Sequence, residues 1–99
     1  MSSTQSTVMA DNDQVRVTTV TFGAEGATTG PHRHEFDYVV VPVTGGAFLV
    51  TESDGSLREM TQVAGSPYLG VAGTAHDVAN KAGQEAVFVE IELKRQHTV

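Results

Sequence analysis

Two histidines, His32 and His34, stand two residues apart at the entry to a run of β-forming residues. Side chains alternate faces along a strand, so residues two apart point the same way, about 7 Å apart. Two imidazoles on one face can lean toward one point and share a metal ion. The same alternation places Phe36, Tyr38 and Val40 on the histidine face. This stretch therefore predicts a strand that presents metal ligands to an interior.

A third histidine, His76, follows a glycine-rich turn and begins another short β-type run. Imidazole is a general ligand for zinc, copper, iron and nickel, so His32 and His34 are candidate metal ligands and His76 is a candidate third. Asn80 follows His76 by four residues and falls on the same face. We expect Asn80 to close the turn after its strand rather than to donate to a metal ligand.

The rest of the chain consists of short β-type runs separated by glycine-rich turns, with no helical period. Asp54-Gly55 between two such runs predicts a hairpin, because glycine tolerates the positive φ of the turn. The pattern alone predicts an all-β sandwich or barrel. The run over 37–43 is nearly continuous in apolar residues, so we expect burial on both faces. Pro42 within it predicts an edge position or the end of the strand.

The two histidine stretches resemble the paired sequence motifs of the cupin superfamily. The first motif is Gly-x5-His-x-His-x3–4-Glu-x6-Gly, and residues 26–45 match it with Tyr38 at the glutamate position. The second is Gly-x5-Pro-x-Gly-x2-His-x3-Asn, and residues 65–80 match it with Val71 at the proline position. Within the superfamily, the chain is similar to small single-domain bacterial cupins, a group that includes β-alanine degradation cupins.

The resemblance implies a single-domain jelly-roll β-barrel with a divalent metal bound by His32, His34 and His76 in its lumen. Tyr38 stands where most cupins carry a carboxylate ligand. We expect a neutral phenol that donates to a metal-bound water, an oxygen species or the substrate. Ligation as a phenolate and a purely structural tyrosine are the alternatives.

Three neutral imidazoles would leave the ion its full positive charge and an open coordination position, which favours a small anionic metabolite. The resemblance implies iron in an oxygen-dependent dioxygenase as the leading function, while zinc, nickel, manganese or copper would fit the ligands equally. The alternatives are a metal-dependent lyase or isomerase, and a non-catalytic sensor or storage protein that binds a small ligand.

Ninety-nine residues correspond to one domain. We expect a barrel over residues 13–95, flanked by a flexible arm (1–12) and a tail (96–99). Twelve acidic against six basic residues, with no basic cluster, argue against nucleic acid and anionic membranes as partners. The chain has no apolar run of membrane-spanning length and no leader-like start, so the expected location is the cytoplasm.

The final β-type run, residues 86–94, alternates cleanly. One face is apolar and consists of Val87, Val89, Ile91 and Leu93. The other face carries Glu90 and Glu92, which we expect to be solvated unless the strand lies in an interface. The apolar face, the small size of the chain and the cupin resemblance together predict a homodimer.

Overall fold

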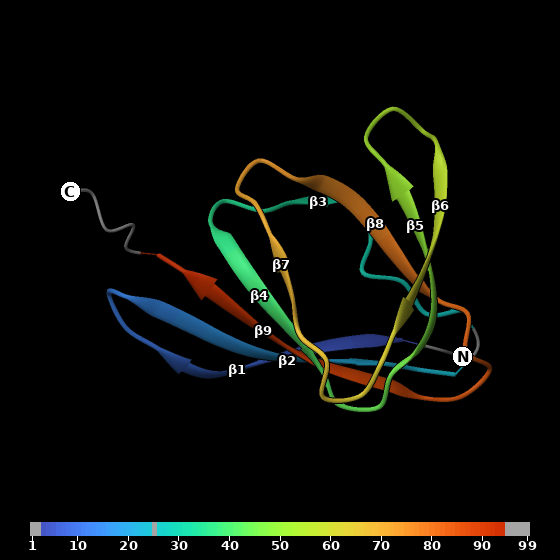
Figure 1. Ribbon diagram of the computed structural model, residues 1–99, viewed down its shortest axis with the longest axis horizontal. Coiled ribbons are helices and arrows are strands. Elements are labelled where there is room, and N and C mark those ends of the chain that lie inside the picture. The colour runs from blue at the N-terminus through green and yellow to red at the C-terminus, as the bar shows by residue number, and fades with distance from the viewer. Residues whose placement is uncertain (1–2, 25, 95–99) are drawn as a thin grey trace.

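The fold is built entirely from β-strands. The computed structural model describes residues 3–24 and 26–94, and these contain nine strands and no helix (Figure 1). Nothing in this part of the chain forms a helix long and apolar enough to cross a membrane. In chain order the strands are β1 (Thr4–Asp11), β2 (Val15–Phe22), β3 (His32–Arg33), β4 (Asp37–Pro42), β5 (Gly46–Glu52), β6 (Leu57–Gln62), β7 (Tyr68–Gly70), β8 (Ala75–Asn80) and β9 (Ala86–Leu93).

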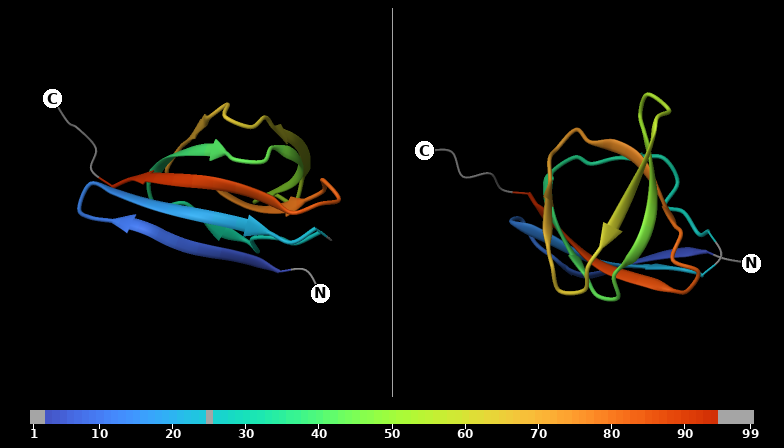
Figure 2. Two further views of the ribbon diagram at one scale, coloured as in Figure 1. Left: turned by 90° about the horizontal axis from the view of Figure 1, so that it is seen from below. Right: turned by 45° about the vertical axis from the view of Figure 1, so that its right-hand side comes forward.

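The strands form two antiparallel sheets. One sheet has the order β1-β2-β9-β4-β7 and the other has the order β3-β8-β5-β6. The right-hand view of Figure 2 shows the two sheets curling around a common interior. This jelly-roll arrangement confirms the predicted all-β class, because the short glycine-bounded runs of the sequence became the strands of two facing sheets.

The turn between β5 and β6 has the predicted hairpin chemistry. Gly55 adopts a φ of 88°, a value that a residue with a side chain rarely takes. The Glu52 amide donates to the Ser56 carbonyl oxygen at 2.8 Å, and the Asp54 carboxylate accepts from the Ser56 amide at 2.9 Å. The Asp-Gly pair therefore fixes the register of β5 against β6, from Gly46↔Gln62 to Thr51↔Leu57.

The expectation of a flexible arm over residues 1–12 is wrong for β1. This strand pairs with β2 from Thr4↔Phe22 onward, with a bulge between Val8 and Ala10. Most of its side chains are exposed, as suits the edge strand of a sheet. Its threonines and serines showed no hydrophobic period because hardly any of them enters the core. The predicted tail, residues 96–99, lies outside the described residues.

The strand β4 differs from the expected strand buried on both faces. Its burial alternates, with Tyr38, Val40 and Pro42 buried and the side chains between them half-buried. The inner face looks into the space between the sheets, whereas the described chain places no element over the outer face. Pro42 is the last residue of β4, so its missing amide hydrogen interrupts no ladder inside the strand.

One end of the interior is an aromatic core. Phe22, Phe48 and Phe88 meet with ring centroids 5.3 to 6.2 Å apart, in edge-to-face and tilted contacts. All three are at most 5% exposed. Phe22 lies on β2 directly opposite Ala86 of β9, and both are fully buried. This cluster joins the two sheets and leaves the opposite end of the interior for other side chains.

Asn80 ends β8 and has the turn role predicted for it. Its side chain is almost fully buried, and its amide group donates to the carbonyl oxygens of Gly23 and Gln84 at 3.0 and 2.8 Å. Its amide oxygen accepts from the Ala82 backbone at 2.9 Å. Asn80 thus ties the turn before β9 to the end of β2.

Candidate metal centre

The three histidines of the sequence motifs come together from two adjacent strands. His32 on β3 stands directly opposite His76 on β8. His34 follows β3 and continues the pairing, since its amide donates to the Thr74 carbonyl and its carbonyl accepts from the Gly73 amide, both at 2.8 Å. The backbone on both sides of His34 is therefore fixed.

The strand that was expected to run continuously from the histidines into the apolar run is in fact two strands. β3 ends at Arg33, the chain bends over residues 34–36, and β4 begins at Asp37 in the other sheet. His34 and Tyr38 nevertheless both line the interior pocket, as predicted. Phe36, predicted on the same face, lies in the bend, is partly buried and does not line the pocket.

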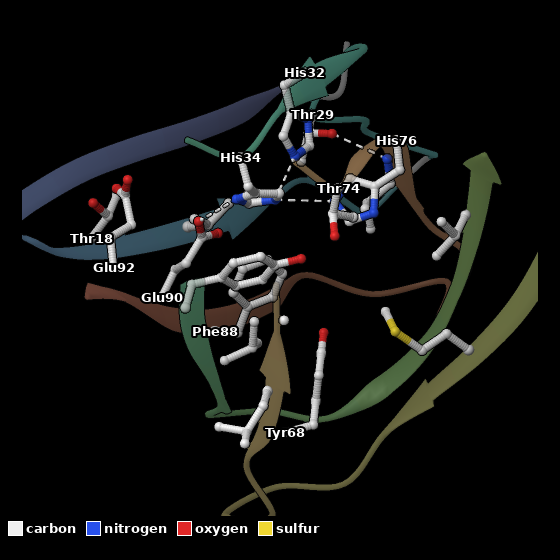
Figure 3. Close-up of a pocket in the computed structure, with 18 of the residues that line it drawn as sticks. Thr18, Thr29, His32, His34, Tyr68, Thr74, His76, Phe88, Glu90 and Glu92 are labelled. Atoms are coloured by element: carbon white, nitrogen blue, oxygen red, sulfur yellow. Dashed lines mark hydrogen bonds and ion pairs between the residues drawn. The ribbon is translucent and has the colours of Figure 1, made fainter. Parts of the chain in front are cut away.

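The Nε2 atoms of the three rings converge (Figure 3). The Nε2 atom of His34 lies 3.2 Å from that of His32 and 3.1 Å from that of His76. Metal–nitrogen bonds are about 2.1 Å long, so separations of this size allow these nitrogens to bind one ion together. The group could therefore hold a metal ion and leave further coordination positions open.

Two of the rings are oriented by acceptors at their other nitrogen. His32 Nδ1 lies 2.9 Å from the Gly30 carbonyl oxygen, and His34 Nδ1 lies 3.3 Å from a carboxylate oxygen of Glu90. Both oxygens only accept, so each Nδ1 carries the hydrogen and each Nε2 of the neutral ring presents a lone pair. In these tautomers the Nε2 lone pairs of His32 and His34, 3.2 Å apart, would both be available to a cation.

His76 is a poor base in this setting. Burial lowers its pKa from 6.5 to about 4, and the neighbouring His32 and His34 rings add to the effect because a second positive charge beside them is unfavourable. The imidazole of His76 is consequently neutral at pH 7, which is the form that binds a metal ion.

Tyr38 packs flat against His34. The two ring centroids are 3.8 Å apart with an interplanar angle of 18°, and the tyrosine is 5% exposed. Burial raises the pKa of Tyr38 to about 12, and the negative charge of Glu90 contributes in the same direction. The phenol is therefore neutral at pH 7, which is the protonation state that the sequence analysis favoured.

Gly70 makes room for that tyrosine. Gly70 on β7 stands directly opposite Tyr38 on β4, and a Cβ atom at Gly70 would lie 2.0 Å from Cζ of the tyrosine ring. The role of this glycine depends on a pairing between two strands that are far apart in the sequence. No local pattern at Gly70 signals it.

The expectation that Glu90 and Glu92 form a solvated face is wrong. Both residues line the pocket. A carboxylate oxygen of Glu90 lies 3.3 Å from His34 Nδ1, and Glu92 lies 3.4 Å from the guanidinium of Arg16 on β2. A signal was present in the sequence: Phe88 shares their face, and a large aromatic residue beside two carboxylates suggests an inner rather than an outer face.

The histidines open onto a cavity of about 820 Å³. Its wall is largely apolar, with hydroxyl groups added by Thr18, Thr29, Thr74 and Tyr68. The Tyr68 hydroxyl accepts a hydrogen bond from the Gln62 amide at 2.9 Å, so its own hydrogen is free to donate to a ligand. A mostly apolar cavity with a few polar groups near one point is typical of a small-molecule site.

Comparison with known proteins connects this geometry to a family. No protein-family model matches the chain. The beta-alanine degradation protein BauB of Pseudomonas aeruginosa is 49% identical over 88 residues, covering 89% of this chain and 90% of BauB. The crystal structure of a cupin domain from Bordetella pertussis has a TM-score of 0.88 and 41% identity, covering 94% of this chain and 95% of that one.

A more distant structure extends the comparison of folds. A sugar phosphate isomerase of the cupin superfamily from Silicibacter pomeroyi has a TM-score of 0.68 and 22% identity, covering 93% of this chain and 60% of that one. At this level of identity the likeness concerns the fold alone.

Proposed function

This chain belongs to the cupin superfamily, and from that premise we propose that it is a metal-binding cupin acting on a small, anionic metabolite. In this proposal His32, His34 and His76 bind one divalent metal ion. The observation that carries it is the convergence of their Nε2 atoms at 3.1 to 3.2 Å, with two of the rings held by acceptors at Nδ1. Such second contacts fix the tautomer that a metal requires.

The leading function is oxygen-dependent oxidation of that metabolite by an iron-loaded protein. A bound divalent ion would supply a Lewis acid with open positions for a substrate oxygen. Zinc, nickel, manganese and copper suit the same ligands, and with them a lyase or isomerase reaction becomes the better proposal. An anion is favoured because three neutral imidazoles leave the charge of the ion uncompensated within its ligand set.

The side chains of the pocket would orient such a substrate. Tyr38 is a buried neutral phenol beside His34, and Tyr68 has a free hydroxyl hydrogen on the neighbouring strand. Tyr38 faces Gly70 across the β4–β7 ladder, and Tyr68 is two residues before Gly70 on the same face. We assign Tyr38 the role of hydrogen-bond or proton donor to the substrate. Its protonated state at neutral pH suits hydrogen-bond donation and excludes a role as a base, and the raised pKa opposes full release of the proton.

The comparison with BauB supports a carboxylate as the substrate class. The name of that relative places it in the degradation of β-alanine, a small amino acid. At 49% identity over nearly the whole of both chains, a role in the same process is the most economical proposal for this protein. A compound of this size occupies only part of the 820 Å³ cavity.

A second candidate is a binding protein that captures the metabolite without converting it. The position of the carboxylates favours it, because Glu90 is engaged by His34 and Glu92 by Arg16. Among the described residues that line the pocket, no other carboxylate is available to serve as a general base. Oxygen uptake or turnover of β-alanine-derived carboxylates by the iron-loaded protein would exclude this alternative.

The decisive experiment is the metal content of the purified protein, after stripping and reloading with each candidate ion. We expect one equivalent per chain for the wild type and none for His76→Ala. The matched control is Glu35→Ala, which removes an exposed acidic side chain next to His34 and should leave the stoichiometry unchanged. His76→Gln provides a second variant with better-preserved packing. A fully loaded His76 variant, or an empty wild type under all ions, would refute the site.

We also propose that the protein is a homodimer formed through the outer face of the five-stranded sheet. On β9 that face carries four half-buried apolar side chains, and no described element covers them: Val87, Val89, Ile91 and Leu93. A second copy of the chain would bury this apolar face. Light scattering at micromolar concentration should give twice the chain mass, and Ile91→Glu should give the mass of one chain. A monomeric wild type would refute the dimer.

A further inference from the structure

We propose that Glu90 is a positioning residue that acts through His34. In this proposal its carboxylate supplies a negative charge on the side of the His34 ring that faces away from the metal site. In most cupin motifs a carboxylate ligand at the position of Tyr38 would supply that charge. The inference rests on the proposed metal site. It assigns a role to a residue that belongs to neither histidine motif and lies on the last strand of the fold.

The geometry separates Glu90 from the point where the ligands meet. Its carboxylate oxygen is 3.3 Å from His34 Nδ1, whereas the other two histidines approach His34 at Nε2 (Figure 3). The two nitrogens of an imidazole direct their bonds to different sides of the ring. While this contact holds, Glu90 would act on a bound ion only through the ring of His34 and would not be a ligand itself.

The surroundings make this contact strong. The side chains of His34 and Glu90 are only 7% and 18% exposed, so water screens their interaction weakly. Glu90 sits on β9 between β2 and β4, directly opposite Thr18 and Val40. A position in the middle of a sheet restricts how far the carboxylate can move. Among the described ion pairs, His34 is the only partner of Glu90.

Apart from Glu90, the contacts of His34 do not determine which of its ring nitrogens carries the hydrogen. Tyr38 stacks on the face of the ring, which restrains its plane but does not decide which nitrogen carries the hydrogen. A carboxylate oxygen 3.3 Å from Nδ1 favours the tautomer with the hydrogen on Nδ1, which leaves the Nε2 lone pair for an ion. An ionised acceptor also makes Nε2 a better electron donor and offsets part of the charge of the ion.

The experiment compares Glu90→Ala and Glu90→Gln with Glu92→Gln. Glu92 is the matched control, since it lies two residues along the same face of β9 and pairs with Arg16 instead of a histidine. The first readout is the tautomer of His34 in the metal-free protein, from the nitrogen chemical shifts of the imidazole. The second is the affinity for zinc alone, measured by competition with a chelator.

We expect the wild type and Glu92→Gln to show the Nδ1–H tautomer and equal zinc affinity. Glu90→Ala should mix the two tautomers and weaken zinc binding about 10- to 100-fold, the usual effect of removing such a partner. Glu90→Gln keeps an acceptor but no charge, so it should retain the tautomer and lose less affinity. An unchanged tautomer and affinity in Glu90→Ala, or an equal loss in Glu92→Gln, would overturn the assignment.

The two readouts keep this inference distinct from the proposed function. If the wild type binds no zinc, the proposed metal site fails, and the tautomer measurement still tests the coupling of Glu90 to His34. If the wild type binds zinc and Glu90→Ala binds it equally well, the metal site stands and the positioning role fails.

Discussion

The interior between the sheets has an aromatic core at one end and the histidine-lined cavity at the other. Strand β9 contributes side chains to both. Its first inward residues, Ala86 and Phe88, are buried in the aromatic core, and Phe88 also forms part of the cavity wall; its later inward residues, Glu90 and Glu92, line the cavity with carboxylates. One strand with a single alternation thus contributes apolar side chains at one end and carboxylates at the other. The comparison shows how a small domain separates the part that stabilises it from the part that binds.

Burial of the aromatic side chains stabilises the fold, whereas the arrangement of the histidines lowers its stability. Fully burying a side chain such as phenylalanine contributes about 1.5–3 kcal/mol. At the other end, two imidazole lone pairs face each other at 3.2 Å and a carboxylate is only 18% exposed. Without a cation this arrangement is unfavourable, as functional sites commonly are when the rest of the fold holds them in place.

The largest effect is expected at the aromatic end. Phe48→Ala removes a ring that contacts both Phe22 and Phe88 and should lower the free energy of unfolding by about 3–5 kcal/mol. His32→Ala, a truncation at the other end, should cost the metal-free protein far less, because it also removes the contact between lone pairs. Urea titration of both variants measures this. Equal losses would remove the distinction between the two ends.

The second effect should come from the metal. Ions that bind only the folded state at a thousandfold excess over Kd stabilise by about 4 kcal/mol, so the histidine end would then contribute nearly as much as the aromatic end. We expect a rise in Tm of the wild type with added metal and none in His76→Ala. If no candidate ion changes the Tm of the wild type, the prediction is wrong.

The third effect concerns the packing of the Tyr38 ring against Gly70. Gly70→Ala places a Cβ where the Tyr38 ring now lies, and should destabilise the protein by about 1–3 kcal/mol while displacing the ring from His34. Leu69→Ala is the control, because Leu69 is on the same strand and 78% exposed, and its effect should stay within about 0.5 kcal/mol. Denaturant titration gives the stabilities, and tyrosine fluorescence reports the displacement of Tyr38.

Much of the candidate site could be predicted from the sequence, because its ligands are local. His32 and His34 are two apart, and His76 arrives in a second motif of fixed spacing, so alternation and motif spacing were enough. The all-β class followed from short runs and turn residues such as Gly55. Each pattern is local, whereas the two histidine stretches, with His34 and His76 42 residues apart, were joined through their resemblance to the paired cupin motifs.

The remainder of the site depends on pairings between distant strands. Gly70 matters only because β7 lies beside β4, and Glu90 matters only because β9 turns that face inward beside His34. The strand β1 was not predicted for a related reason. An edge strand forms by pairing its backbone with the neighbouring strand, and its sequence can lack a hydrophobic period. The register of paired strands and the face to which each side chain points depend on tertiary structure, so local sequence patterns do not specify them.

The smallest effect concerns the metal-free protein and pH. The pKa of His76 is about 4 in the folded state against about 6.5 in the unfolded state, so between these values the unfolded chain binds more protons. The stability of the metal-free protein should therefore be fully present above pH 6.5 and fall as the pH drops toward 4. Urea titrations at pH 7 and pH 5 measure this fall, and His76→Gln should reduce it. A fall of equal size in that variant would assign the pH dependence to other groups and leave the histidine end without its expected sensitivity to protons.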